Sequence, residues 1–407
     1  MRIFCAIRHA NDPKHYYGGL WSGNFYPALR ELGHEIIESQ TDLFPASRFM
    51  DIASDFTPEE LEVRARTTEQ ILAEVRAVHQ QAPVDLFLSY FYNSHFDPAG
   101  FDELRRMGIP SVNFYCNSIY QFSYVAAIAA KVDFAWHAER DARASYLAVG
   151  ANPIWVQMAA DPKVYYPVPG LTRESKACFV GQNYADRDRW LAALINAEVP
   201  VDIYGRGWGA ESAQPTSVAA SEVVDPSAYL GRVSPPLGRP ASYVAVVRQT
   251  VQRDGWLRGM MRVSRQWQYR RETKKIAPRF APHAKGVASI IADTFSSYEL
   301  CLNFSNVWGD GRPGSPLIPH VRLRDFEAPM CRTCYLTGHT EEITEFYEVG
   351  QEIDTYRTPA ELVDKARFYL THPGAAEKLR DAGYRRALRD HTWKRRFEEL
   401  FRKIDVG

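Results

Sequence analysis

Residues 322–338 read RLRDFEAPMCRTCYLTG. The pattern predicts a short helix beginning at Arg324-Asp325-Phe326-Glu327 and then a strand over CYLTG. A second helix, a short strand over residues 352–356 and a long charged helical tail are expected to follow. Open sheets with this order of elements bind nucleotides at the carboxyl ends of their parallel strands. Glu327 is therefore expected at a helix N-terminus beside such an edge.

The same alternation of strand and helix occurs twice along the chain. In the first 160 residues it begins with a strand over Arg2–Ile7, a glycine-rich loop and a helix over Asn24–Leu32. It restarts with a strand over Lys176–Val180 and a helix over Asp186–Asn196. The stretch AADPKVYYPVPGLTR, residues 159–173, contains three prolines and predicts a linker. The fold class expected is α/β, with two Rossmann-like doubly wound domains facing a cleft.

The expected domain boundaries follow from these patterns. Residues 1–165 form the first domain, and residues 166–390 form the second with an insertion at about 235–285. Residues 391–407 form a helix that crosses back to the first domain. A chain of 407 residues is long enough for two cores of this size.

Composition narrows the class of protein further. The chain is 45% hydrophobic and 24% charged, and its formal net charge is zero, so no global field favours nucleic acid. The start MRIFCAIRH turns polar too early for a signal peptide, and no run of eighteen apolar residues occurs. The six scattered cysteines indicate reduced core thiols and a cytoplasmic location. Cys331-x-x-Cys334 is a single CxxC, which is weak support for a zinc site.

The insertion differs in charge from the rest of the chain. Between Arg239 and Lys285 there are twelve basic and two acidic residues, a net charge of +10, interleaved with Trp, Met, Leu and Val. A basic helix with apolar residues on one face can lie in a membrane interface, which predicts a peripheral position on an anionic membrane surface. Packing of the insertion on the second domain, with a solvated basic face, is the alternative. Nucleic acid is not expected as a partner.

Two motifs resemble those of GT-B glycosyltransferases, in particular the CgeB-like branch. The pattern R-x-FE followed by HTxxxR is represented here by Arg324, Phe326, Glu327, His391, Thr392 and Arg396. The linker pattern DPxxYxP is represented by Asp161, Pro162, Tyr165 and Pro167. The resemblance implies transfer of a sugar from a nucleotide-diphosphate sugar to a hydroxyl of a glycan, lipid-linked or small-molecule acceptor. A catalytically silent nucleotide-sugar-binding or scaffold protein and a GT-B epimerase stay open as alternatives.

The resemblance places the donor site in the second domain. Glu327 matches the second glutamate of the E-x7-E pattern and would accept hydrogen bonds from both ribose hydroxyls. The position of the first glutamate is Pro319, followed by His320. Guanidinium groups suit the diphosphate, for which the candidates are Arg322, Arg324 and Arg312.

The β–α turns of the second domain supply further donor-side candidates. Gly181 follows the first strand and would let the backbone approach the sugar or phosphate. Gln182 and Asn183 would donate amide hydrogen bonds, and Arg187 would add a cation one helical turn later. Tyr204, at the end of the next strand, is expected to lie near the base. No metal motif of the DxD type stands out, so metal independence is predicted, without a cofactor.

The first domain is expected to hold the acceptor and the catalytic base. His9 follows the first strand, on the side where ligands bind, and an imidazole can deprotonate a hydroxyl. Gly18 and Gly19 are expected in a loop over the reaction centre. His95 and Asp97, after the strand VDLFLS, are alternatives as base. His391 and Thr392 are interpreted as structural residues between helices.

Overall fold

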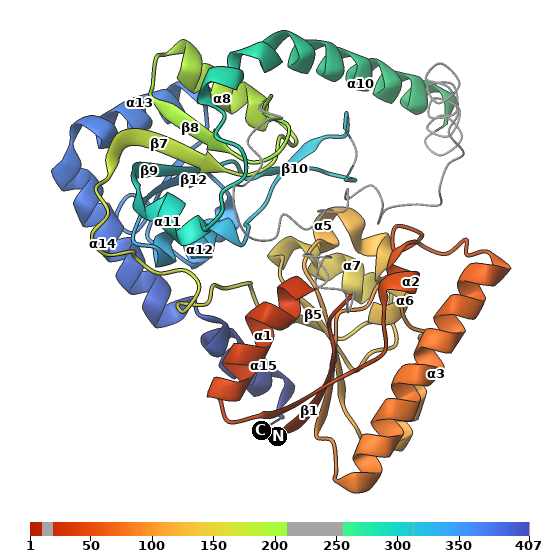
Figure 1. Cartoon of the computed structure of the whole chain (residues 1–407). Coiled ribbons are helices and arrows are strands. Elements are labelled where there is room, and N and C mark those ends of the chain that lie inside the picture. The colour runs from red at the N-terminus through yellow and green to blue at the C-terminus, as the bar shows by residue number, and fades with distance from the viewer. Residues whose placement is uncertain (10–18, 210–254, 312, 407) are drawn as a thin grey trace. The chain divides into compact units, whose positions relative to one another are not determined.

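The computed structural model describes residues 1–9, 19–209, 255–311 and 313–406. These residues form two compact units, one made of residues 1–9, 19–158 and 393–406 and the other of residues 159–209, 255–311 and 313–392 (Figure 1). Gly18, Arg312 and residues 235–254 of the predicted insertion lie outside the described residues.

The first unit is built on a six-stranded parallel sheet. The strand order is β2-β1-β3-β4-β5-β6. The strands are β1 (Arg2–Ala6), β2 (Glu35–Glu38), β3 (Leu86–Ser89), β4 (Ser111–Tyr115), β5 (Phe134–His137) and β6 (Pro153–Trp155). The chain adds β2 on one side of β1 and β3 on the other. The topological switch point, at which ligands bind in such sheets, therefore lies between β1 and β3.

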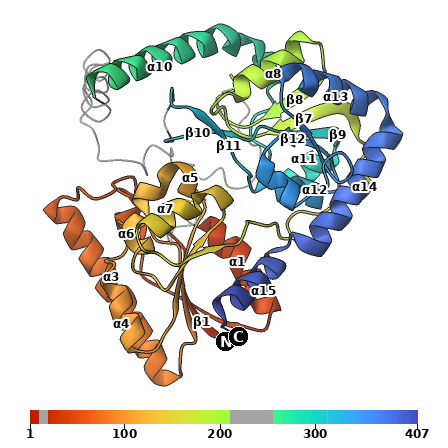
Figure 2. The same cartoon turned by 180° about the vertical axis from the view of Figure 1, so that it is seen from behind.

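Helices cover both faces of this sheet (Figures 1 and 2). On one face lie α1 (Leu20–Glu31) and α15 (Trp393–Ile404), and on the other α3 (Pro58–Gln81) and α4 (Gly100–Arg106). The ring of Phe25 stacks on Trp136 of β5 at 5.3 Å between centroids, and Phe397 packs against the same tryptophan. Short helices complete the unit: α2 (Phe44–Ser47), α5 (Ser118–Gln121), α6 (Ala126–Ala129) and α7 (Arg143–Ala148).

Local signals explain where two of these helices begin or end. Helix α3 begins with a capping box, in which the Thr57 hydroxyl accepts from the Glu60 N–H and the Glu60 carboxylate accepts from the Thr57 N–H. Helix α1 begins four residues before the predicted Asn24. It ends before Gly33, whose φ of +81° favours glycine, as predicted.

The second unit is built on a five-stranded parallel sheet in the order β13-β12-β9-β7-β8. Its strands are β7 (Glu174–Val180), β8 (Val201–Tyr204), β9 (Tyr298–Asn303), β12 (Cys334–Gly338) and β13 (Asp354–Tyr356). Strand β7 comes first along the chain, with β8 added on one side and β9 on the other. The switch point of this sheet therefore lies between β7 and β9.

Helices also cover both faces of the second sheet (Figure 2). Helices α8 (Arg187–Asn196) and α13 (Pro359–Thr371) lie on one face, where Leu191 and Leu362 join a core with Phe179 and Leu302. Helices α11 (Ile291–Ser296) and α12 (Arg324–Met330) lie on the other face, and α14 (Pro373–Asp390) packs against α12 and β12. The predicted charged helical tail is confirmed and consists of α13, α14 and α15.

Two predictions for this unit are wrong in part. The glycines and prolines of residues 309–319 predict a loop. The segment instead ends in a strand, β11 (Leu317–Pro319), which pairs antiparallel with β10 (Asn306–Trp308) through Val307 and Ile318. The helix predicted after CYLTG is a 3₁₀ turn over Glu341–Glu345, where the hydroxyl of Thr340 accepts from the Ile343 N–H. Short hairpins and 3₁₀ turns have weak sequence periodicity, which is why they were not recognised.

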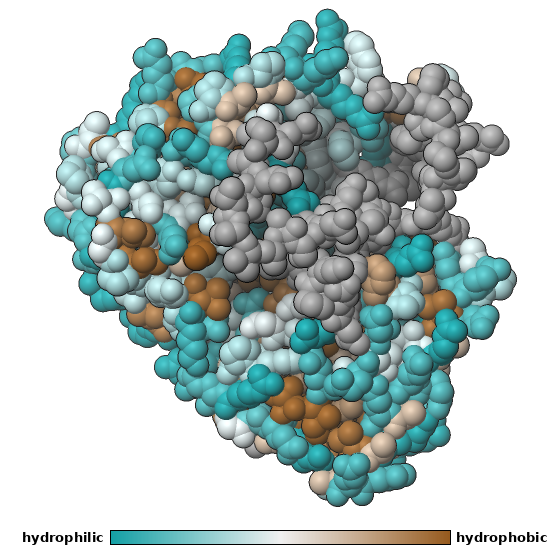
Figure 3. Space-filling model, in the orientation of Figure 1, coloured by the Kyte–Doolittle hydropathy of each residue, from teal (hydrophilic) through white to brown (hydrophobic). Residues whose placement is uncertain are grey.

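The basic insertion contains one long helix, α10 (Trp256–Ile276), which runs along the edge of the second unit (Figure 1). Hydrophilic residues follow its course at the upper edge of the surface view (Figure 3). All six cysteines are buried and free. Among the described helices, none is long and apolar enough to cross a bilayer.

Candidate functional site

The switch point of the second sheet is formed by the segments that follow β7 and β9. Residues 181–186 lead from β7 into α8, and residues 304–323 lead from β9 through the β10–β11 hairpin into α12. These segments carry most of the donor-side residues expected from the sequence.

Three arginines gather at this edge. Arg187 is the first residue of α8, and Arg322 and Arg324 stand at the start of α12. Burial, together with the positive charges of Arg322 and Arg324, lowers the pKa of Arg187 from 12.5 to about 9. The charge of Arg187 is thus destabilised by two neighbouring guanidinium groups, and an anion bound beside it would relieve this repulsion.

The hydrogen bonds of this arginine cluster (Arg187, Arg322 and Arg324) are incomplete within the chain. Arg187 donates from Nη1 to the carbonyl oxygen of Gln182 at 2.9 Å, and Arg322 donates from Nη2 to that of Asn306 at 2.9 Å. The Nε atoms of Arg187 and Arg322 are buried, and neither has a hydrogen-bond partner in the described part of the chain. Buried donors without partners are uncommon, so each is available to a ligand.

Glu327 lies beside the cluster in the first turn of α12. Its Oε2 accepts from Nη1 of Arg324 at 2.7 Å, and the Arg324 guanidinium also lies 5.1 Å from the centre of the Phe295 ring. The exposed fraction of the Glu327 side chain is 9%. One ion pair therefore sets the orientation of both groups that the resemblance assigns to the donor.

Asp325 holds the start of α12 in place, a role that was not predicted from the sequence. Its Oδ2 accepts from the Arg322 N–H at 2.7 Å. Its Oδ1 accepts from Asn303 at 3.1 Å, from Tyr335 at 2.8 Å and from Thr337 at 2.9 Å. Burial raises the pKa of Asp325, and these hydrogen bonds oppose that rise. Asp325 thus fixes Arg322 relative to β9 and β12.

Two glycines bring the backbone close together next to the cluster. A Cβ at Gly181 would lie 2.6 Å from the ring of Phe179 and 3.0 Å from Nη1 of Arg187. A Cβ at Gly205 would lie 2.2 Å from the carbonyl oxygen of Gly181, and the φ of Gly205 is +132°. The absence of side chains at both positions therefore allows the turns after β7 and β8 to pack closely against each other and against Arg187.

The other donor-side candidates have different surroundings. Asn183 donates from its backbone N–H to Arg206 at 3.0 Å and from Nδ2 to Gly207 at 3.2 Å, so its amide stabilises the neighbouring turn. The hydroxyl of Tyr204 is bonded to that of Tyr298 at 2.9 Å, at the first residue of β9. The structure thus brings Gly181, Gln182 and Arg187 to the arginine cluster, whereas the Tyr204 hydroxyl is bonded to Tyr298, which in turn donates to Asp202 of β8 at 2.8 Å.

His320 also lies at this edge and was not assigned a role from the sequence. It follows Pro319, occupies the region of the missing first glutamate and is buried. Burial and the charge of Arg322 lower its pKa to about 3, so the imidazole is neutral. Its buried position, directly before the Arg322 segment, makes it part of the wall of the site.

The switch point of the first sheet holds two histidines. His9 follows β1, and its Nε2 lies 2.5 Å from the carbonyl oxygen of Tyr90. Since a carbonyl only accepts, Nε2 carries the proton and Nδ1 has the free lone pair. Burial lowers the pKa of His9 to about 4. The ring is therefore neutral near pH 7, as a general base must be before it takes a proton.

His95 and Asp97, the alternative bases, differ in exposure. His95 is fully buried, lies 4.4 Å from His9 between ring centres, and its Nε2 contacts the Ser47 hydroxyl at 2.8 Å. Asp97 is exposed and lies 3.5 Å from Arg64. His95 thus supports the ring of His9, whereas Asp97 lies outside this pair. Gly19 precedes α1, and a Cβ at this position would lie 3.8 Å from the Ser22 hydroxyl oxygen and 3.9 Å from Nη1 of Arg8.

His391 has a structural contact. Its Nε2 lies 2.8 Å from the carbonyl oxygen of Phe346, and its ring packs against Phe326 and Tyr347. The HT pair of the sequence motif therefore stands where α14 ends, packed behind α12.

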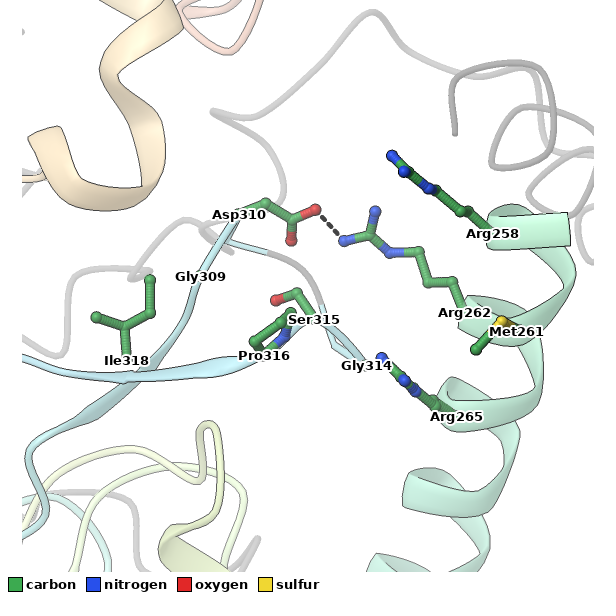
Figure 4. A pocket seen from close by; sticks show the side chains of 10 residues that line it. All are labelled: Arg258, Met261, Arg262, Arg265, Gly309, Asp310, Gly314, Ser315, Pro316 and Ile318. Carbon is green, nitrogen blue, oxygen red and sulfur yellow. Dashed lines mark hydrogen bonds and ion pairs between the residues drawn. The ribbon is translucent and has the colours of Figure 1, made fainter. Parts of the chain in front are cut away.

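A separate cavity of about 710 Å³ lies between α10 and the β10–β11 hairpin (Figure 4). It is lined by Arg258, Met261, Arg262, Arg265, Gly309, Asp310, Gly314, Ser315, Pro316 and Ile318. Arg262 points across it to the carboxylate of Asp310, with which it forms an ion pair (Figure 4). Within the described ranges, no three His, Cys, Asp or Glu residues are grouped as metal ligands. The predicted metal independence stays a prediction.

Comparison with known proteins agrees with this geometry. Residues 258–402 match the family described as "Glycosyl transferase-like". Sucrose-phosphate synthase from Thermosynechococcus elongatus superposes with a TM-score of 0.55 at 12% identity, over 99% of each chain. A glycosyltransferase from Rickettsia africae gives 0.55 at 9% identity, over 99% of this chain and 98% of that one. The fold is GT-B.

A third GT-B structure carries a ligand. HepE from Anabaena, in complex with UDP, superposes with a TM-score of 0.53 at 9% identity over the whole of both chains. None of the curated proteins compared with this chain matches it significantly. The predicted GT-B fold class is thus confirmed, together with a glycosyltransferase-like domain that includes Arg322, Arg324 and Glu327. The narrower CgeB-like resemblance stays a prediction.

Proposed function

We propose that this protein transfers a sugar from a nucleoside diphosphate sugar to a hydroxyl acceptor. The observation that carries the proposal is the arginine cluster at the switch point of the second sheet. Its members lower the pKa of Arg187, and two buried Nε donors lack partners. A diphosphate supplies the negative charge and the acceptor oxygens that such a cluster lacks.

The donor would lie across the carboxyl ends of β7 and β9. In this arrangement Arg187 and Arg322 bind the diphosphate, and the bare backbone at Gly181 allows close approach of the sugar or phosphate. Glu327, oriented by Arg324 at 2.7 Å, accepts hydrogen bonds from the ribose. HepE, which has a similar fold, is in complex with UDP, so UDP-sugars are the first donors to test.

In the chemical step, the acceptor oxygen forms a bond to the anomeric carbon while the bond from that carbon to the diphosphate oxygen breaks. The diphosphate leaves with the bonding electrons, and the arginine cluster stabilises its growing charge without a metal ion. The acceptor proton passes to a base, for which we propose Nδ1 of His9. The Tyr90 carbonyl and the ring of His95 hold that imidazole in its tautomer and orientation.

The first test is thermal unfolding of the protein with UDP, GDP, ADP, CMP and TDP, each with and without magnesium. A ligand at 100 times its Kd stabilises the folded state by about 2.7 kcal/mol, which shifts Tm clearly. We expect a magnesium-independent increase with one nucleoside diphosphate, lost in Arg322→Met and retained in Arg402→Met, an exposed control on α15. No increase with any of them would refute the donor site.

Turnover is a separate measurement. The assay measures release of the nucleoside diphosphate from the matching nucleotide sugar. It is run with and without lysate fractions that supply acceptors, and therefore tests transfer itself. Nucleotide binding without any release in either case would favour a catalytically silent binding protein over an enzyme.

A further inference from the structure

Helix α10 has a charge and hydropathy pattern that the sugar-transfer proposal does not use. It spans 21 residues, or about 30 Å, and carries seven basic residues and one acidic residue, Glu272. Its net charge is therefore +6, in a chain whose formal net charge is zero.

One stripe of α10 is anchored to the second unit. The stripe recurs at steps of three and four residues and consists of Gly259, Arg262, Gln266, Tyr269 and Thr273. The Tyr269 hydroxyl donates to the carbonyl oxygen of Ala185 at 2.8 Å, and the Thr273 hydroxyl donates to Asp188 at 2.8 Å. These bonds fix the rotation of the helix about its own axis.

The outward side of α10 exposes five large apolar residues. Their exposed fractions are 71% for Trp256, 72% for Leu257, 43% for Met260, 56% for Met261 and 63% for Trp267. At about 100° per residue they fall within an arc of about 140°, centred nearly opposite the anchored stripe. Large apolar side chains gathered on one exposed face mark an interaction surface.

Cations border this apolar face and continue beyond it. Arg271, Lys274 and Lys275 stand on the outward side in the last turns, after Trp267, and the Arg271 guanidinium lies 5.4 Å from the Trp267 ring. Arg258 and Arg265 stand at one edge, beside the cavity of Figure 4. Arg258, Arg265, Lys274 and Lys275 make no hydrogen bond or ion pair with any described residue, so four positive charges face solvent.

We propose that the outward face of α10 docks on an anionic phospholipid bilayer, with the helix lying in the plane of the interface. The apolar residues would enter the boundary between head groups and acyl chains, and the cations would meet lipid phosphates. A nucleic acid or acidic polysaccharide would engage the cations and leave Trp256 and Leu257 in water. A second copy of the chain docked on this face would bring two helices of net charge +6 together, and these would repel each other. A bilayer satisfies both properties of the face.

The test is co-sedimentation of the full chain with vesicles of phosphatidylcholine alone or with 30% phosphatidylglycerol. We expect at least tenfold stronger binding to the anionic vesicles, weakened by high salt. Lys274→Glu with Lys275→Glu is expected to abolish the preference. The control is Arg385→Glu with Arg402→Glu, at exposed sites outside α10. It makes the same change in net charge and should retain the preference for anionic vesicles. Tm of each variant confirms folding.

A second measurement separates a bilayer from a polyanion. Leu257→Ser with Trp267→Ser is expected to weaken vesicle binding at least fivefold, whereas Leu147→Ser, at an exposed apolar site on α7, leaves it unchanged. Quenching of tryptophan fluorescence by brominated lipid should fall in the same double variant. Equal binding to both vesicle types, or full binding by either α10 variant, would overturn the proposal. Tight binding to heparin that is insensitive to Leu257→Ser with Trp267→Ser would assign the face to a polyanion instead.

Discussion

Arg187 and Arg322 lie in one buried cluster, and the charge of Arg322 helps to lower the pKa of Arg187 to about 9. The cluster is thus unfavourable to the ligand-free fold and favourable to an anion. Binding sites commonly sacrifice some stability in this way, because the groups that recognise the ligand are not paired in its absence.

The first prediction follows from the opposite effects of Arg187 on the stability of the ligand-free fold and on anion binding. Arg187→Met removes a buried charge that disfavours folding at pH 7, so we expect Tm of the ligand-free protein to rise. The same change removes a phosphate ligand, so the increase in Tm caused by the nucleoside diphosphate should disappear. Thermal unfolding of wild type and variant, with and without nucleotide, measures both. A lower ligand-free Tm with a retained nucleotide response would contradict this role.

The second prediction concerns Asp325. In Asp325→Asn an NH2 group replaces one of the two carboxylate oxygens. The NH2 group can only donate, so the neighbouring groups that donated to that oxygen lose their acceptor. We expect the free energy of unfolding to fall by about 2–3 kcal/mol, because buried donors lose their partner. Nucleotide affinity should fall as well, because the Arg322 backbone loses its anchor. Urea unfolding and nucleotide titration at 25 °C measure the two effects.

Glu327→Gln is the matched comparison for that variant. Glutamine has nearly the shape of glutamate but no charge. The substitution, in the same helical turn as Asp325, therefore weakens the 2.7 Å contact with Arg324. We expect a smaller loss of stability than in Asp325→Asn and about a tenfold loss of nucleotide affinity, about 1.4 kcal/mol, from the weaker ribose contact. Unchanged affinity would remove Glu327 from the donor site.

The third prediction tests the backbone approach between Gly205 and Gly181. Gly205→Ala would place a Cβ 2.2 Å from a carbonyl oxygen at a φ of +132°, so we expect a loss of about 3 kcal/mol of stability. Gly350→Ala is the control, since its φ is +85° and no atom lies within 4 Å of the added Cβ. About 1 kcal/mol is expected there. Equal losses, measured by urea unfolding, would show that the close contact relaxes freely.

The sequence predicted the parts of this molecule that rest on periodicity and turn chemistry. Strand and helix alternation predicted both sheets, and Gly181, Arg187 and Glu327 were placed at strand ends because parallel sheets bind ligands there. The role of Asp325 was missed, since its partners Asn303 and Tyr335 come from strands that only the fold brings together. Tyr204 stays a prediction for the base, and its hydrogen bond to Tyr298 could not be predicted from its position at a strand end.

The last prediction concerns acid stability. Burial lowers the pKa of His9 to about 4, of His137 to about 4 and of His320 to about 3, and that of His95 lies well below 6.5. Each is neutral in the folded state and becomes protonated on unfolding below pH 6.5. Stability is therefore fully present above pH 6.5 and falls towards pH 4, with each histidine contributing up to about 1.4 kcal/mol per pH unit.

Urea unfolding between pH 8 and pH 4.5 measures this dependence. We expect the free energy of unfolding to be constant above pH 7 and to decline steeply below pH 6.5. In His9→Asn the slope of this decline should be smaller by about the contribution of one proton. If His9 is also the base, the same variant loses transfer activity at pH 7.5, where its stability is not limiting. A slope unchanged in His9→Asn would mean that the imidazole is not held neutral by the fold. Its place between Tyr90 and His95 would then not account for a neutral ring at pH 7.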